Sequence, residues 1–337
     1  MSSPEPVAAL IASAGWSGAR AVPVAGDASA RRFTRHLRAD GSNAILMDAS
    51  ADPGGSSRRF ADLSAWINAQ GFSAPHVLAA DLPAELLLVE DFGDRLFARL
   101  LAEDPTREAE LYTATAEFLV AFQRVTPPSG LAPLDGPALA NLTRLVIDWY
   151  LPGMDAPVTP EALGIPDLIA RLYDDLAGAA PLVTSLRDFH AENVLWLPDR
   201  SGPARLGLID FQDAVTAHPA YDLVSFLQDA RRDLSPGTEA AVFDLFCREA
   251  GHDPGAFRAV YALIGAQRAL RILGVFARLI RQAGKRRYAA FFPRVWGHLA
   301  ANLTHPALAP LSRAIRATLP EPTPARIDRM IASCPTP

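Results

Sequence analysis

The feature that most constrains this chain is a polar run followed by two short apolar stretches. Residues 186–193 read Leu-Arg-Asp-Phe-His-Ala-Glu-Asn, and the apolar residues 194–197 follow at once. A second apolar stretch, residues 206–209, ends at Asp210. Short apolar runs bounded by turn residues predict strands, so the polar run and Asp210 are expected at neighbouring strand ends.

The spacing of the polar residues in this unit predicts metal-assisted phosphoryl transfer. Asn193 follows Asp188 by five positions, as in a kinase catalytic loop, where the Asp accepts the proton of a hydroxyl and the Asn holds a metal. Asp210 would add a carboxylate for the Mg²⁺ that bridges nucleotide phosphates. The alternative is a surface loop in which Asp and Asn side chains cap turns.

Four segments together resemble a known family. They are residues 186–193, Ile-Asp-Phe-Gln-Asp-Ala at 209–214, Tyr-Asp-Leu-Val-Ser at 221–225 and Gly-Asp-Ala-Ser at 26–29. This set is similar to the aminoglycoside phosphotransferase superfamily. Residues 267–279, with Gly284, Lys285, Arg287 and Tyr288 after them, narrow the resemblance to the bacterial N-acetylmuramate/N-acetylglucosamine anomeric kinases of cell-wall recycling.

The resemblance implies a fold and an activity. The fold is α+β and two-lobed, of the protein-kinase-like phosphotransferase type. It has a β-rich N-lobe over residues 1–92 and a mainly helical C-lobe over residues 93–337. The implied activity is phosphorylation of the anomeric C1 hydroxyl of an amino sugar, with ATP and Mg²⁺ as cofactors, which gives a sugar 1-phosphate.

Composition narrows the possible partners and location. The net charge is −5, so no strongly basic surface is expected to attract nucleic acid or an anionic membrane. The two cysteines, Cys247 and Cys334, suit a reducing compartment. No basic segment precedes the short apolar patch at residues 7–11, so we expect a cytoplasmic protein with no obligate protein partner.

The region before residue 93 predicts strands and two helices. The strands are expected at residues 21–24, 32–37, 44–47, 76–80 and 86–89, and the helices at 4–15 and 58–69. The turn with Asp27, Ala28 and Ser29 would let backbone N–H groups cover phosphates, although it also fits an ordinary hairpin. By resemblance, the backbone of residues 90–92 (Glu90, Asp91, Phe92) would meet adenine; the alternative is a plain strand-to-helix turn.

The rest of the chain predicts helices, among them residues 111–122, 142–149, 221–230 and 256–283. By resemblance, Asp222 would brace the catalytic loop by accepting hydrogen bonds from its backbone. The alternative role is that of a carboxylate near a helix N-terminus, where the helix dipole favours negative charge.

One expected residue is missing. Kinases pair a strand lysine with the α- and β-phosphates, but Met47 occupies that position and Lys285 is the single lysine of the chain. Arg31 or Arg32 is the hypothesised replacement. Adjacent strand side chains point to opposite faces, so at most one of the two is expected to reach the nucleotide.

The acceptor site is expected around the catalytic loop and the long C-terminal helix. Candidates for sugar hydroxyls or metal-bound waters are Arg187, His190, Glu192, Gln212 and Asp213. Arg268 or Arg271 would bind the lactyl carboxylate of N-acetylmuramate, because a guanidinium matches a carboxylate in shape and charge. The alternative for these two arginines is a solvated helix face.

Two rival functions stay open at this point. One is another kinase of the superfamily, acting on an aminoglycoside, choline or homoserine; the arginine-rich helix favours a neutral or anionic acceptor over a cationic one. The other is a nucleotide-binding protein without catalysis, suggested by the missing lysine. The complete set of Asp188, Asn193 and Asp210 argues against it.

Overall fold

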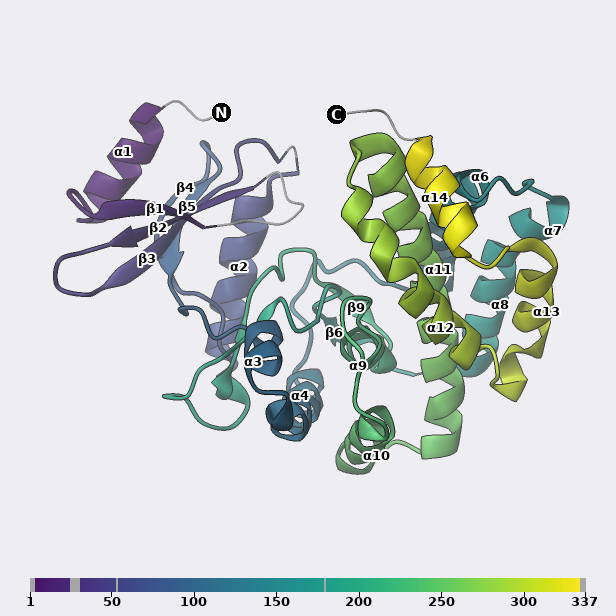
Figure 1. Cartoon of the computed structure of the whole chain (residues 1–337). Coiled ribbons are helices and arrows are strands. Elements are labelled where there is room, and N and C mark those ends of the chain that lie inside the picture. Colours follow the sequence, from purple (N-terminus) through teal and green to yellow (C-terminus); the bar gives the residue numbers. More distant parts are fainter. Residues whose placement is uncertain (1–3, 25–30, 53, 179, 334–337) are drawn as a thin grey trace. The chain divides into compact units, whose positions relative to one another are not determined.

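A computed structural model describes residues 4–24, 31–52, 54–178 and 180–333 of the chain (Figure 1). The fold is α+β, as predicted, with a five-stranded sheet near the N-terminus and a mainly helical remainder. The strands are β1 (Arg20–Val24), β2 (Arg32–Leu37), β3 (Asn43–Asp48), β4 (Val77–Asp81), β5 (Leu86–Glu90), β6 (Val183–Ser185), β7 (Val194–Trp196), β8 (Leu206–Leu208) and β9 (Val215–Ala217).

Most helices lie after the sheet in the chain. The longer ones are α1 (Pro4–Ser13), α2 (Ser56–Ala69), α4 (Glu108–Gln123), α5 (Gly136–Leu145), α8 (Ile165–Ala177), α9 (Ala220–Leu227), α10 (Thr238–Ala250), α11 (Pro254–Ala283), α12 (Phe292–Asn302), α13 (Ala309–Thr318) and α14 (Pro324–Ala332). The shorter ones are α3 (Phe97–Glu103), α6 (Leu151–Gly153), α7 (Pro160–Leu163), η1 (Pro105–Arg107), η2 (Val146–Tyr150), η3 (Gly202–Arg205), η4 (Arg286–Phe291) and η5 (Pro306–Leu308).

The chain forms two compact units. The first contains residues 1–128 and 191–214, and the second contains residues 129–190 and 215–337. Asp188 therefore belongs to the second unit, while Asn193 and Asp210 belong to the first. The predicted division into lobes at residue 92 stays a prediction.

The sheet of the first unit is antiparallel throughout, in the order β1-β2-β3-β5-β4. Alternate residues of its strands face opposite sides. Ala44 and Leu46 of β3, with Leu86 and Leu88 of β5, form a core with Leu10 of α1, which covers that side of the sheet (Figure 1). The apolar face of α1 therefore packs against β3 and β5.

The predicted strand pair is present as the β7–β8 hairpin and packs within the first unit. Val194 pairs with Leu208 in an antiparallel ladder. Leu208 N donates a 2.8 Å hydrogen bond to Ser73 O, and the Phe211 ring stacks on Phe60 of α2 with centroids 4.7 Å apart. These contacts fix the end of the hairpin, where Asp210 lies.

The core of the second unit is built around α11. Asp253 caps its N-terminus by accepting from Ala256 N, and Gly284 ends it in the left-handed conformation, with φ 63°. Gly274 lies against the backbone of Leu145 and Val146, where no side chain fits. The length and hydropathy of α11 would suffice to cross a membrane, but most of its apolar stretch is buried inside the protein, as in the core helix of a globular fold.

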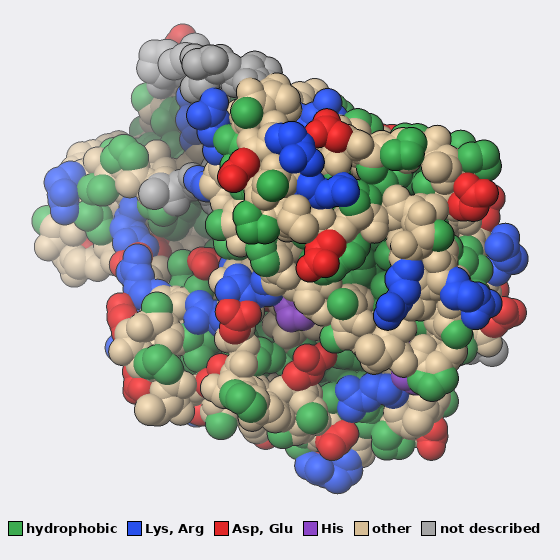
Figure 2. Space-filling view, turned by 45° about the vertical axis from the view of Figure 1, so that its right-hand side comes forward, with side chains coloured by type: hydrophobic (Ala, Val, Ile, Leu, Met, Phe, Trp, Pro, Cys, Tyr) green, Lys and Arg blue, Asp and Glu red, His purple; other side chains and the backbone are tan. Residues whose placement is uncertain are grey.

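Charged side chains of both signs cover the face shown in Figure 2. Blue basic and red acidic groups are interspersed there and do not separate into large fields of one sign. Some charged side chains of the described residues are paired: Arg294 lies 2.5 Å from Asp233, and Arg329 lies 3.0 Å from Asp155. Exposed pairs of this kind contribute little to stability, about 0–1 kcal/mol each.

Candidate active site

In the first unit, the β7–β8 hairpin brings Asn193 and Asp210 to the same end of two paired strands. Ile209 N donates a 3.1 Å hydrogen bond to Asn193 O. Asn193 is thus bonded to the residue that precedes Asp210. Asp210 has a positive φ of 58°, which is unusual for a residue other than glycine. Strained backbone of this kind persists where surrounding contacts hold it, often at functional sites.

The two oxygens of Asp210 have different surroundings. Oδ1 accepts from Arg31 Nη2 at 2.7 Å and from Gln212 Nε2 at 2.9 Å. Oδ2 accepts no hydrogen bond from any described residue. The Asp210 side chain is 40% exposed, whereas that of Arg31 is 11% exposed. One carboxylate oxygen is thus held by protein donors and the other is available to a cation.

The donor set in this unit suits Mg²⁺ bound together with a nucleotide. No group of three or more His, Cys, Asp or Glu side chains able to hold a metal occurs among the described residues. Mg²⁺ is commonly held by one or two carboxylates, with phosphate oxygens and waters completing its coordination. The Asp210 carboxylate and the Asn193 amide oxygen fit that pattern.

The structure separates the two arginines that follow the β1–β2 turn. Arg31 contacts Asp210, whereas Arg32 pairs with Asp48 of β3 at 2.6 Å. Met47, at the position of the missing lysine, is buried and lies opposite Phe33 in the sheet. Asp27, Ala28 and Ser29, predicted to cover phosphates, lie outside the described residues.

The segment predicted to meet adenine is held by charged side chains of the first unit. Glu90 pairs with Arg200 at 2.7 Å, and Asp91 pairs with Arg35 at 2.6 Å. Phe92 packs so closely on Gly207 of β8 that a Cβ there would come within 2.8 Å of its ring. The sequence reading missed Arg35; its position three residues after Arg32 gave no sign of a partner on another strand.

In the second unit, Asp222 at the start of α9 fastens the loop that carries Asp188. Its carboxylate accepts from Ser185 Oγ at 2.7 Å, Leu186 N at 2.7 Å and Arg187 N at 3.2 Å. Burial raises the pKa of Asp222 to about 6, against the opposing effect of these donors and of Arg268. Arg187 itself has a positive φ of 68°, so this loop is also held in a strained conformation.

Asp188 lies in a cationic environment. Burial would raise the pKa of its carboxyl, but the charges of Arg271, Arg268, His190 and Arg187 outweigh burial and hold that pKa below its ordinary value. Burial lowers the pKa of His190, so its imidazole is neutral near pH 7. Asp188 is therefore ionised throughout the physiological range.

Arg268 and Arg271 differ in what they contact. Arg268 is 7% exposed; it donates to Ser225 Oγ at 2.5 Å and to Arg187 O at 3.3 Å, and lies 4.7 Å from the centre of the Tyr221 ring. Arg271 is half-buried, and its Nε finds no hydrogen-bond partner among the described residues. The guanidinium of Arg268 is thus occupied by the catalytic loop and α9, whereas that of Arg271 has donors to spare.

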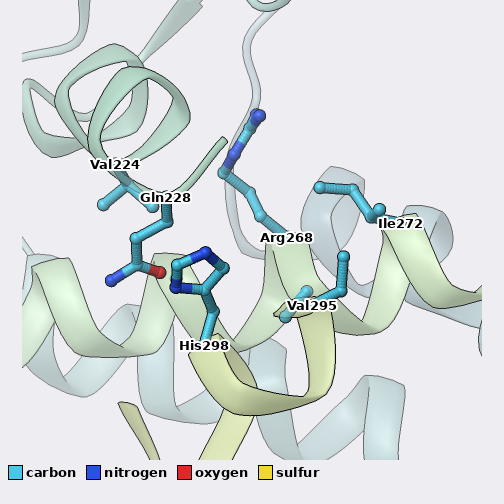
Figure 3. A pocket seen from close by; sticks show the side chains of 8 residues that line it. Val224, Gln228, Arg268, Ile272, Val295 and His298 are labelled. Atoms are coloured by element: carbon cyan, nitrogen blue, oxygen red, sulfur yellow. The ribbon is translucent and has the colours of Figure 1, made fainter. Parts of the chain in front are cut away.

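A cavity beside Arg268 is too small to be the acceptor site. Gln228 at the C-terminal end of α9, Arg268 and Ile272 of α11, and His298 of α12 converge around it, and the Arg268 guanidinium points away from His298 (Figure 3). Its free volume is about 10 Å³, enough for a single water molecule and far below the size of a sugar ring.

Three further candidates for the acceptor site, Glu192, Gln212 and Asp213, belong to the first unit. Glu192 and Asp213 are exposed members of the first unit, and Gln212 is buried there against Asp210. Sequence reasoning also missed Ser185 and Ser225, which link Asp222, Arg187 and Arg268. The Tyr-Asp-Leu-Val-Ser segment contained Ser225, but nothing in its spacing indicated a bond to α11.

Comparison with known proteins shows the family of the chain and its relatives. Residues 20–263 match the model of the phosphotransferase enzyme family. An N-acetylmuramate/N-acetylglucosamine kinase of Caulobacter vibrioides is 39% identical, over 90% of this chain and 93% of that protein. A protein of the same description from Pseudomonas aeruginosa is 29% identical, over 93% of each chain.

Solved structures of low sequence identity share the fold. A choline/ethanolamine kinase family protein from Mesorhizobium loti has a TM-score of 0.57 and 17% identity, over 94% of this chain and 100% of that one. An aminoglycoside phosphotransferase, solved in a ternary complex with streptomycin and ATP, has a TM-score of 0.59 and 12% identity, over 90% and 97% of the two chains.

Proposed function

The chain belongs to the phosphotransferase enzyme family, and from that premise we propose that it phosphorylates the anomeric C1 hydroxyl of N-acetylmuramate and N-acetylglucosamine with ATP. The observation that carries the proposal is the ionised Asp188 on a loop fastened by Asp222. The relatives of 29–39% identity supply the sugar class. The sugar 1-phosphate would feed peptidoglycan recycling in the cytoplasm.

Asp188 would act as the base that orients and finally deprotonates the sugar hydroxyl. The anomeric hydroxyl belongs to a hemiacetal and is more acidic than an ordinary alcohol, so a carboxylate of low pKa is an adequate base for it. Phosphoryl transfer asks the protein mainly for positioning and charge stabilisation. The bonds from Ser185, Leu186 and Arg187 to Asp222 provide the positioning.

Asn193 and Asp210 would hold Mg²⁺, which when bound neutralises charge on the β- and γ-phosphates. The backbone of residues 90–92 (Glu90, Asp91, Phe92) would receive adenine, and the backbone around Asp27, Ala28 and Ser29 would cover the phosphates. The pairs Glu90–Arg200 and Asp91–Arg35 would keep the adenine-binding backbone in place.

The acceptor sugar would contact residues near the catalytic loop. We assign the lactyl carboxylate of N-acetylmuramate to Arg271, because Arg268 is buried and already bonds Ser225 and Arg187, whereas Arg271 is half-buried and its Nε has no partner among the described residues. Arg268 then serves as a second brace of the loop. Sugar hydroxyls and metal-bound waters are left to Arg187, His190, Glu192, Gln212 and Asp213.

The test is ATP consumption with a panel of acceptors: the two amino sugars, glucose, an aminoglycoside, choline and homoserine. We expect turnover on the amino sugars, with the phosphate at C1. The Asp188→Asn variant should lose about 10²-fold or more of that turnover, the usual contribution of a general base, and still bind ATP.

A matched control is Asp199→Asn, which changes an exposed aspartate in the β7–β8 turn and should keep full activity. Turnover on choline or an aminoglycoside, with none on the amino sugars, would show that the chain is a kinase of the same family with a different acceptor. ATP binding without turnover on any acceptor would instead favour a non-catalytic protein, and near-normal turnover by Asp188→Asn would reject the assigned base.

A further inference from the structure

The pairing of Arg31 with Asp210 has a consequence for metal binding. Both residues belong to the first unit, and Arg31 Nη2 lies 2.7 Å from Asp210 Oδ1. The Arg31 side chain is 11% exposed, and that of Asp210 is 40% exposed. A charge-assisted hydrogen bond of this length is stronger than one between neutral groups.

Gln212 reinforces the same oxygen. Its Nε2 donates to Asp210 Oδ1 at 2.9 Å, and its side chain is almost fully buried. Two donors on Oδ1 discourage a cation from binding both carboxylate oxygens at once. The geometry leaves Oδ2 as a single ligand for an incoming metal.

We propose that Arg31 is a positioning residue that makes metal binding depend on nucleotide binding. Without nucleotide, the Arg31 charge neutralises Asp210 and repels a divalent cation that approaches Oδ2. With nucleotide, the triphosphate supplies negative charge for both the guanidinium and the metal. This inference rests on the proposed function in taking Asp210 as a metal ligand.

The proposal also accounts for the missing lysine. Met47 cannot balance phosphate charge, whereas Arg31 sits beside the carboxylate that would hold the metal. The guanidinium has five donors, so it can keep its bond to Oδ1 and still reach a phosphate oxygen. A lysine from β3 would offer three donors from a single point.

Arg32 provides a matched control. It is adjacent to Arg31 and has the same charge, but it pairs with Asp48, and its side chain is 51% exposed. Removing it changes the net charge as much as removing Arg31 does. The two variants differ in which carboxylate loses its partner: Asp210 in Arg31→Gln, and Asp48 in Arg32→Gln.

The experiment measures Mn²⁺ binding by electron paramagnetic resonance, with and without saturating ADP, in the full chain and in Arg31→Gln, Arg31→Lys and Arg32→Gln. In Arg31→Gln we expect tighter Mn²⁺ binding without nucleotide and weaker ADP binding. The factor by which ADP improves Mn²⁺ affinity should fall at least about fivefold, the low end of usual coupling between sites.

Arg31→Lys should restore part of the coupling, and Arg32→Gln should keep all of it. By reciprocity, Mn²⁺ must improve ADP affinity by the same factor in each protein, which gives an internal check. Unchanged coupling in Arg31→Gln, or a change of both affinities in the same direction, would overturn the proposal. Should Arg31→Gln fail to fold, full coupling in the folded Arg31→Lys variant would also overturn it.

These measurements need no sugar, so they stay separate from the test of the proposed function. A protein that couples Mn²⁺ to ADP through Arg31 but phosphorylates no amino sugar would keep this inference and lose the substrate assignment. The opposite result would keep the substrate and remove the role of Arg31.

Discussion

At the scale of single residues, two predictions concern Arg271: its effect on the pKa of Asp188 and its contact with the substrate carboxylate. Its charge helps to hold the pKa of Asp188 below the ordinary carboxyl value, against the effect of burial. A base works when ionised, so activity falls as pH drops through its pKa. In Arg271→Ala the Asp188 pKa should rise, and the acid limb of kcat against pH, measured with N-acetylglucosamine, should move to higher pH.

The same variant tests the carboxylate contact. Loss of a hydrogen bond to a charged group costs about 1.5–3 kcal/mol, so the KM for N-acetylmuramate should rise about tenfold or more while that for N-acetylglucosamine changes little. Arg278→Ala, two turns further along α11, is the control for both measurements. Equal KM changes for the two sugars would remove Arg271 from the carboxylate site, and an unmoved acid limb would remove its effect on Asp188.

The sequence predicted which residues to consider at this scale, but not their partners. The spacing of Asp188, Asn193 and Asp210 follows from the chemistry of a catalytic loop. The choice between Arg31 and Arg32 does not, because the Arg31–Asp210 bond joins residues 179 positions apart. Arg268 and Arg271 likewise lie three residues apart in one helix, but only Arg268 bonds the catalytic loop and Ser225.

At the scale of elements, the close contact of α11 with the preceding helices predicts a sensitive glycine. A Cβ on Gly274 would clash with the carbonyl group of Leu145, and backbone atoms cannot easily move aside. Gly274→Ala should therefore destabilise the protein by about 1–3 kcal/mol, the usual cost of overpacking. The measurement is urea unfolding followed by circular dichroism.

Gly297 of α12 is the matched control, since nothing lies within 4 Å of a Cβ built there. Alanine at an open helix position should stabilise the fold by about 0.5–1 kcal/mol. If Gly274→Ala were as stable as Gly297→Ala, the packing of α11 against Leu145 and Val146 would have to be looser than described.

Periodicity predicted this long helix closely, at 256–283 against Pro254–Ala283 in the structure. The segment expected as a helix at 142–149 divides into the α-helix α5 and the π-helical turn η2. A single π-helical turn inserts one residue into a helix, and the apolar pattern of a short segment is too coarse to register that insertion. Apolar spacing therefore could not predict it, and the approach of Gly274 to this turn is visible only in three dimensions.

At the scale of the whole molecule, the first unit is assembled from two separate pieces of chain. Residues 191–214 complete it through the bond of Leu208 to Ser73 and the stacking of Phe211 on Phe60. A fragment of residues 1–128 should therefore lack cooperative unfolding. The same fragment joined by a flexible linker to residues 191–214 should regain it, as measured by thermal unfolding.

Replacing Phe211 by Ala in the joined fragment gives the control, because it removes the stacked ring while keeping the chain length. Cooperative unfolding of residues 1–128 alone would contradict the prediction. The composition of this unit could not be predicted from the linear order of strands and helices, since the hairpin enters it long after the sheet is complete.

The arginine-rich make-up of the protein also determines which reagents can label it. Lys285, just beyond the end of α11, carries the single side-chain amine of the sequence, and the unit with Met47 and Asp210 has none. ATP analogues with an acylating group will therefore leave no lysine adduct in that unit. Affinity probes for this protein must react instead with guanidinium or carboxylate groups.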